Sequence, residues 1–526
     1  MGVLGLLSTC LEDADACTDT YDLVQVAQQP GGLELIVDFN SFKHHILLKF
    51  WKGLSKLRGN YFLRILGGEY ETLHNYVTKL VNDLKSLDIH LVFYIDGEKG
   101  SSIEVLRQKF DTWKERHIKE IERMSQILNV LRQKTDIRDM SWDTNINPVL
   151  LNDQLMATLR SCDCEIHQSP VGEADLLIIR ALRDSPMAFA ILSNDSDFCV
   201  FKGSRLIPDD LFDIENDLQL REPRELPEKP RKLIVKVIST ENVMDMLNEM
   251  DPGFRQAVIH SRNFYNLRGE PDKCPDKGDF SLHAQQLLLV PHVTGTQRHL
   301  CGTCAHTATR LPYRIVLPME EQLVNEHGRS PSELSEAQIK PDRTVENLQT
   351  FHRIWSHQEK GEAVNCFERH GGKNGFIVYI LRYFLLLNWQ QNLNVTENEF
   401  LALVVMVIGR WDEKHYQAMI IRPSIRCVNI GNWMQDVYRH GYQMFGSVLH
   451  IGHEFPLPSE LFSGSVWAAL YMACQGGEKL RKKKKKAPLS ICKTVLHKTQ
   501  KEMDAVILEN RDMIRDIVQD VFPFDD

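Results

Sequence analysis

Short apolar segments alternate with longer amphipathic segments through the first part of the chain. Three of the short segments, 33–37, 90–95 and 188–192, are rich in β-branched and aromatic residues and end on polar ones. Between the first two lies 70–87, where apolar residues recur every three or four positions, as on one face of a helix. Strands that alternate with helices need crossover connections, which favour a mostly parallel sheet with flanking helices. The sequence therefore predicts an α/β domain.

Acidic residues follow each of the three strand-like segments, and two more stand where a loop enters a helix predicted to begin near Leu176. They are Asp38, Asp96, Glu173, Asp175, Asp195 and Asp197. Because ligands of parallel sheets bind outside the carboxyl ends of the strands, we expect these side chains to converge on one edge. An acid at any one of these places commonly caps a helix or shapes a turn, which is the alternative interpretation of each.

Six carboxylates at one edge would repel one another unless cations lay between them. Mg²⁺ and Mn²⁺ prefer carboxylate and water oxygens as ligands. Two such ions about 4 Å apart can activate a water and stabilise both the attacking and the leaving oxygen of a phosphodiester. The pattern therefore favours a divalent metal site with hydrolytic chemistry.

The order and spacing of these motifs resemble the flap-endonuclease superfamily. The resemblance covers residues 1 to about 205 and rests on Met1–Leu6, Val37-Asp38, Ile95-Asp96-Gly97, Gly172–Asp175 and Asp195-Ser196-Asp197. Within the superfamily, two further motifs look most like the asteroid family: Gly67-Gly68-Glu69-Tyr70 and the run from Leu192 to Cys199. A more distant likeness, through the run from Lys109 to Arg116 with Trp113 inside it, is to the constitutive coactivators of peroxisome proliferator-activated receptor gamma.

The resemblance implies a PIN-like domain in which the six acids are metal ligands, with Glu173, Asp175 and Asp195 on the first ion. It also implies a Lys and an Arg at the base of a helical arch over the active site. Lys109 and Arg116 are seven residues apart, about two helical turns, so both could reach one phosphate. The alternative is that the Lys- and Arg-rich helix 107–132 is a solvated face.

One element of the superfamily pattern is absent. A seventh aspartate, in a Gly-Asn-Asp turn before a helical hairpin that grips duplex DNA, has no counterpart in 252–266, and no motif identifies Asp272 or Asp276 with it. The resemblance therefore implies a complete first ion site and leaves the second ion without one ligand.

Composition shifts suggest four parts: a PIN-like nuclease domain over 1–220, a linker and irregular region over 221–344, a mainly helical domain over 345–475, and a tail over 476–526. Prolines among charges at 221–232, and a polar stretch at 328–344, indicate exposed connections. The tail holds a basic run and an apolar stripe, 503–521, at helical spacing. We expect this stripe to pack on the helical domain, with binding of a protein partner as the alternative.

The net charge of the chain is −9, from 62 Lys and Arg against 71 Asp and Glu. Seven basic residues nevertheless fall within 479–486, a run that suits nuclear import, a phosphate contact or a charged linker, of which we favour import. No apolar run approaches the roughly 18 residues of a spanning helix, so no membrane association is expected. The 12 scattered cysteines favour reduced thiols in the nucleus or cytoplasm.

Four residues with zinc-type side chains lie close together in the irregular region: His299, Cys301, Cys304 and His306. Structural zinc sites usually take their ligand pairs from separated segments, because ligands this crowded are hard to place at tetrahedral positions. We therefore interpret them as loop residues, with zinc binding as the alternative.

These observations predict a structure-selective endonuclease that depends on Mg²⁺ or Mn²⁺ and acts on single-stranded or flap DNA, with DNA repair in the nucleus as its setting. The alternative is a catalytically weak or inactive binding protein with a nuclease fold, acting in transcription or signalling. Retention of all six acids favours the enzyme, because a scaffold has little reason to keep mutually repelling charges together.

Overall fold

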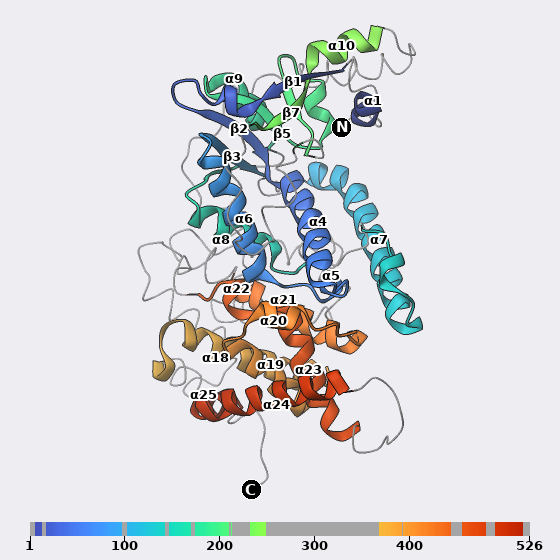
Figure 1. Cartoon of the computed structure of the whole chain (residues 1–526), viewed down its shortest axis with the longest axis vertical. Coiled ribbons are helices and arrows are strands. Elements are labelled where there is room, and N and C mark those ends of the chain that lie inside the picture. The colour runs from blue at the N-terminus through green and yellow to red at the C-terminus, as the bar shows by residue number, and fades with distance from the viewer. Residues whose placement is uncertain are drawn as a thin grey trace. The chain divides into compact units, whose positions relative to one another are not determined.

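A computed structural model describes most of the chain outside its central region (Figure 1). The described residues are 6–12, 17–96, 103–142, 147–169, 174–209, 212, 232–248, 368–391, 393–442, 455–479 and 490–518. The chain forms two compact units that interleave along the sequence. The first comprises Met1–Leu57, Leu73–Leu106 and Leu155–Gly278, and the second comprises Arg58–Thr72, Arg107–Gln154 and Asp279–Asp526.

Several sequence-based predictions concern residues outside the described ranges and stay predictions. They are Glu173, the segment 252–266 with Asp272 and Asp276, the His299–His306 cluster, the connections 221–231 and 328–344, and the basic run from residue 480 onward. Lys479, at the start of that run, is the last residue of a described helix.

The first unit is built on a sheet of seven strands. They are β1 Thr18–Asp22, β2 Leu33–Asp38, β3 Ile89–Ile95, β4 Glu165–Gln168, β5 Ala188–Leu192, β6 Arg205–Ile207 and β7 Ile234–Ser239. Their order is β1-β7-β6-β5-β2-β3-β4. The five strands from β6 to β4 run parallel to their neighbours, whereas β7 is antiparallel to both β6 and β1. The predicted α/β class and its mostly parallel sheet are thus confirmed, as are the three predicted strands.

Helices cover both faces of the sheet. In this unit they are α1 Leu6–Glu12, α3 Leu23–Val26, α4 Phe39–Arg58, α6 Tyr70–Lys85, α8 Leu151–Ser161, α9 Asp175–Asp184 and α10 Thr240–Asn248, some of which extend into the second unit. Successive side chains of a strand point to opposite faces. Ile36 and Val92 accordingly pack in one core cluster with Ile178 of α9. Phe93, next to Val92, meets Phe42 of α4 on the other face, with ring centroids 5.1 Å apart.

The second unit is mainly helical. Its later elements are α18 Gly372–Gln391, α19 Glu397–Ile408, α20 Glu413–Gln417, α21 Ile425–Tyr442, α22 Pro458–Leu461, α23 Gly464–Lys479, α24 Ser490–Glu509 and α25 Arg511–Val518. The earlier segments of the chain contribute α5 Leu63–Leu66 and most of the long helix α7 Ile103–Gln133.

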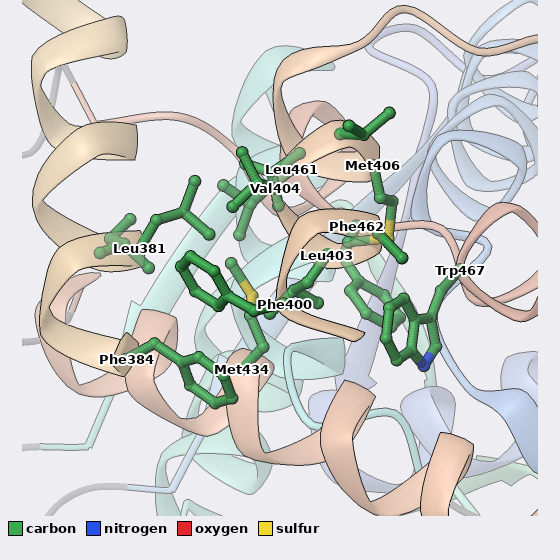
Figure 2. Packing of buried hydrophobic residues seen from close by; sticks show 14 of the residues in the cluster. Leu381, Phe384, Phe400, Leu403, Val404, Met406, Met434, Leu461, Phe462 and Trp467 are labelled. Atoms are coloured by element: carbon green, nitrogen blue, oxygen red, sulfur yellow. The ribbon is translucent and has the colours of Figure 1, made fainter. Parts of the chain in front are cut away.

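One large apolar core joins these helices. Figure 2 shows Phe384 of α18 beside Phe400 of α19, with Met434 of α21 and Trp467 of α23 in the same cluster. Helix α18 is apolar around most of its circumference, as expected for a helix buried on all sides. The one charge in its apolar run, Arg382, is buried and donates to the backbone carbonyl of Asp516 at 2.6 Å.

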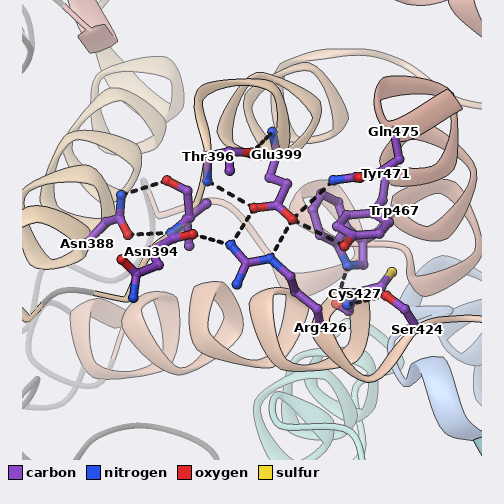
Figure 3. A network of polar contacts seen from close by, with 11 residues as sticks. Asn388, Asn394, Thr396, Glu399, Ser424, Arg426, Cys427, Trp467, Tyr471 and Gln475 are labelled. Atoms are coloured by element: carbon purple, nitrogen blue, oxygen red, sulfur yellow. Dashed lines mark hydrogen bonds and ion pairs between the residues drawn. The ribbon is translucent and has the colours of Figure 1, made fainter. Parts of the chain in front are cut away.

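A buried polar network supports the start of α19 (Figure 3). The side chain of Thr396 caps the helix by accepting from the Glu399 N–H, and the Glu399 carboxylate accepts from the Thr396 N–H in return. Arg426 of α21 donates to both oxygens of the Glu399 carboxylate at 2.6 Å. Tyr471 and Gln475 of α23 donate to the same carboxylate. Glu399 therefore holds three helices together.

The apolar stripe of the tail packs on the helical unit, as expected. Met503 of α24 and both Met513 and Ile517 of α25 lie in its core. The stripe is divided between two helices rather than one, with a break at Asn510. Among the described helices, none is both long enough and apolar enough to cross a membrane.

Candidate active site

Three neighbouring parallel strands bring acidic residues to the same end of the sheet, which we call the carboxyl edge. Asp38 is the last residue of β2, and Asp96 directly follows β3. Asp195 and Asp197 follow β5. The strands β5, β2 and β3 lie side by side, so these acids occupy adjacent positions along the edge. Asp38, Asp96, Asp195 and Asp197 therefore share one edge of the sheet.

Asp38 is half-buried and linked to the end of the neighbouring strand β5 and to the start of α4. Its Oδ2 accepts from the Ser193 hydroxyl at 2.9 Å, and its Oδ1 accepts from the Asn40 N–H at 3.0 Å. Burial raises the pKa of Asp38, and the negative charge of Asp96 raises it further, whereas the hydrogen bonds from Ser193 and the backbone act in the opposite direction. Asp38 therefore caps the start of α4 and also lies close enough to Asp96 for the two charges to interact.

Asp96 connects the edge to the start of α9. Its Oδ2 accepts from the Asn40 side-chain amide at 2.9 Å, and its Oδ1 accepts from the backbone N–H of Ala174 at 3.0 Å. Ala174 lies between Glu173 and Asp175 in the sequence. This hydrogen bond therefore holds Ala174 close to the end of β3, and Asp175 begins α9 directly after it.

Asp195 and Asp197 lie on the loop that follows β5. Asp195 caps the short 3₁₀ helix Ser196–Cys199, because its Oδ1 accepts from the Asp197 N–H at 3.0 Å. The Asp195 N–H donates to the Ser193 hydroxyl oxygen at 3.0 Å, the same hydroxyl that donates to Asp38. One serine side chain therefore joins the loop to the end of β2.

The electrostatics of the loop reflect this crowding of acids. Asp195 is exposed at the surface. Neighbouring protein atoms that limit hydration of its carboxylate raise the pKa of Asp195 to about 6, and the charges of Asp197 and Asp38 contribute to the increase. Asp197 itself is buried. A cation at the edge would relieve the repulsion among these groups.

The acids Asp38, Asp96, Asp195 and Asp197 fit a hard divalent cation in kind, because such ions prefer carboxylate oxygens as ligands. Among the residues that the structure describes, however, no three His, Cys, Asp or Glu side chains form a group that could hold a metal ion. Glu173, which the resemblance implies as a ligand, lies outside those residues. The alternative to metal binding is that these acids cap helices. Asp38 and Asp195 both do so, because each accepts a hydrogen bond from the backbone N–H two residues later.

The two predicted phosphate-contacting residues lie on one helix. Lys109 and Arg116 both belong to α7, which confirms the helix predicted over 107–132. Their side chains are not among the described ones. The role of both residues therefore stays a prediction.

A further acid at the carboxyl edge was missed by sequence reasoning. Asp209 follows β6, the strand next to β5, and is 1% exposed. Its carboxylate accepts from the Ser41 hydroxyl at 2.5 Å. The sequence does place Asp209 shortly after the apolar pair Leu206-Ile207. The strand β6 has only three residues, however, which are too few to be recognised as a strand from their pattern.

A second group of buried acids lies in the helical unit, at the Gly67–Tyr70 motif. Glu69 is fully buried, with its Oε1 accepting from the Ser465 N–H at 2.6 Å and its Oε2 accepting from the Gln417 amide at 2.8 Å. Glu413, also buried, accepts from the same amide at 3.2 Å and from the Thr72 N–H at 3.0 Å. The amide of Gln417 thus bridges two carboxylates.

Burial raises the pKa of both acids of this pair, and the charge of Glu413 adds to the increase at Glu69. The pKa of Glu413 rises to about 7, mainly through burial, with a smaller contribution from the charge of Glu71. The motif requires glycine at Gly68, where φ is +97° and a Cβ would meet the backbone nitrogen of Gly464. The Gly67–Tyr70 motif therefore builds the interior of the helical unit.

Comparison with models of known protein families gives no match, and comparison with curated proteins gives none either. The inference of function therefore rests on the carboxyl edge and on the motifs around it.

Proposed function

We propose that the chain is a structure-selective endonuclease with a PIN-like domain, which hydrolyses phosphodiester bonds in single-stranded or flap DNA with a divalent metal ion. The observation that carries the proposal is the row of acids along adjacent parallel strands: Asp38, Asp96, Asp195 and Asp197, with Asp175 at the start of α9. Hydrogen bonds through Asn40 and Ser193 link the members of this row. Such an arrangement costs repulsion unless a cation is bound.

The residues that would hold Mg²⁺ or Mn²⁺ are Asp38, Asp96, Glu173, Asp175, Asp195 and Asp197. When bound, such ions supply an activated water and offset the negative charge that develops on the phosphate. Glu173, Asp175 and Asp195 are assigned to the first ion. The second ion has no counterpart of the superfamily's seventh aspartate.

Polar side chains of the protein hold the carboxylates in place. Asn40 donates to Asp96, and Ser193 donates to Asp38 while accepting from the Asp195 N–H, so the carboxylates are oriented before substrate arrives. Lys109 and Arg116 would contact the scissile phosphate, the arginine through paired N–H groups and the lysine as a point charge.

A second candidate function is a binding protein with the same fold that has little or no catalytic activity. One specific observation favours it: the described acids Asp38, Asp96 and Asp195 each already accept a backbone N–H hydrogen bond. In that case the edge would be a set of caps, and the protein would act in transcription or signalling through nucleic acid or protein partners.

We further propose the nucleus as the working compartment, with the cytoplasm as the alternative, DNA repair as the setting, and the helical unit as the place where protein partners bind. The support is the basic run 479–486, whose like charges suit an import receptor.

The test is a cleavage assay with the purified full chain. Single-stranded, 5′-flap, 3′-flap and duplex DNA, and a matched RNA strand, are incubated in Mg²⁺, in Mn²⁺, or in EDTA. We expect cleavage of the single-stranded or flapped DNA with either metal, and a fall to background after chelation. Failure to cleave any substrate in either metal would contradict the enzyme and favour the binding protein.

A further inference from the structure

Asp209 takes part in a ring of hydrogen bonds that joins three strand ends. The Ser41 hydroxyl, at the start of α4 after β2, donates to the Asp209 Oδ2 at 2.5 Å. The same hydroxyl oxygen accepts from the Asn194 N–H at 2.7 Å, on the loop after β5. The Asn194 Oδ1 in turn accepts from the Asp209 N–H at 2.9 Å, which closes the ring.

The direction of these hydrogen bonds is fixed by the carboxylate. A serine hydroxyl has one proton, and an ionised carboxylate can only accept. Because Ser41 gives its proton to Asp209, its lone pairs remain to accept from Asn194. Removal of the carboxylate would free the hydroxyl to rotate, and the Asn194 N–H would lose an oriented acceptor.

The segment that carries Asp209 is itself anchored. The Phe212 N–H donates to the Asp209 carbonyl oxygen at 3.2 Å, and Lys49 of α4 donates to the Phe212 carbonyl oxygen at 3.1 Å. Asp209 is therefore held against α4. The ring of hydrogen bonds therefore connects α4 to the loop from Ser193 to Asp197.

We propose that Asp209 is a positioning residue, which acts through Ser41 to hold the loop from Ser193 to Asp197 so that Asp195 and Asp197 stay beside Asp38. This inference rests on the proposed function, because it concerns ligands of the proposed metal. Asp209 is not assigned as a ligand itself, since its carboxylate faces Ser41 and lies within the protein.

The first readout needs no activity. Amide hydrogen exchange over residues 193–199 is followed in the full chain for Ser41→Ala, Asp209→Ala and the double variant. We expect exchange about tenfold faster in each, with the double variant no faster than the singles, because one ring is broken in all three. Asp209→Asn keeps an acceptor oxygen and should restore much of the protection.

The matched control is Ser185→Ala. Ser185 also donates its hydroxyl to a carboxylate, that of Glu34 at 2.7 Å, but at the opposite edge of the same sheet. This variant should leave exchange over 193–199 unchanged. The second readout is Mn²⁺ affinity by titration calorimetry, which should weaken about tenfold in Ser41→Ala and stay unchanged in Ser185→Ala.

The two proposals fail in different ways. Unchanged exchange over 193–199 in a folded Ser41→Ala chain would overturn the positioning role, and so would faster exchange with unchanged Mn²⁺ affinity. If the wild-type chain binds no Mn²⁺, the proposed function fails, while the exchange data still decide whether Asp209 holds the loop. Should Asp209→Ala fail to fold, Ser41→Ala and Asp209→Asn decide the question.

Discussion

Replacement of both Asp195 and Asp197 by asparagine is expected to slow DNA cleavage by at least about 1000-fold, which corresponds to about 4 kcal/mol of transition-state stabilisation. Both residues lie on the loop after β5, beside Asp38, and would hold the metal ion. Asparagine keeps the shape and an acceptor oxygen, so the cap on the Asp197 N–H can persist while two negative charges are lost. Single-turnover cleavage of a labelled single strand, with circular dichroism to confirm folding, measures the change.

The matched control for that variant is Asp184→Asn. Asp184 is exposed at the last position of α9, which lies toward the opposite edge of the sheet, and its replacement removes one negative charge far from the carboxyl edge. Its cleavage rate should equal that of the wild type. Equal rates in all three preparations would show that the activity comes from a contaminant or from another site.

The helical unit is expected to lose stability as the pH rises from about 4.5 to about 7, because of the buried pair Glu69 and Glu413. Below this window the carboxyls are protonated in both the folded and the unfolded chain. Above this window both carboxyls ionise readily in the unfolded chain. In the folded unit, ionisation places a charge in the protein interior, which lowers the stability of the folded state. The pKa of about 7 for Glu413 corresponds to a loss of about 3 kcal/mol in the free energy of unfolding, and Glu69 acts in the same direction.

Glu413→Gln removes the titrating group and keeps an acceptor for Thr72. The variant should therefore show a flatter dependence of stability on pH than the wild type. Urea denaturation followed by tryptophan fluorescence at pH 5, 6, 7 and 8 measures the slope, and Glu397→Gln, an exposed acid in the first turn of α19, is the control. If the free energy of unfolding changes with pH equally in Glu413→Gln and in the wild type, the buried pair does not hold a proton in the folded unit.

Local pattern was sufficient to predict much of the first unit. The strands 33–38, 89–95 and 188–192 have the β-branched and aromatic composition of buried parallel strands, and all three are present. Once these strands are parallel, the acids that follow them must share an edge. This is why the candidate site could be proposed from the sequence. The antiparallel β1 was not predicted, because its sequence Thr-Asp-Thr-Tyr-Asp is too polar to resemble a strand.

Contacts between distant residues could not be predicted. The segments 58–72 and 107–154 belong with the helical unit, although they lie within the stretch 1–220 that sequence analysis treats as one domain. The evidence lies in contacts such as the Tyr70 hydroxyl donating to Gln435 at 2.6 Å across 365 positions, and no local periodicity encodes such a contact. For the same reason, the Gly67–Tyr70 motif gave no sign that Glu69 would be buried against Gln417.

The most direct test of the metal site is calorimetric titration of the purified, metal-free chain with Mn²⁺, without any nucleic acid. We expect saturable binding in the wild type, the same binding in Asp184→Asn, and loss of at least about 100-fold in affinity in the Asp195→Asn/Asp197→Asn chain. Absence of binding in the wild type, or equal binding in the double variant, would show that the acids at the carboxyl edge are caps and not metal ligands.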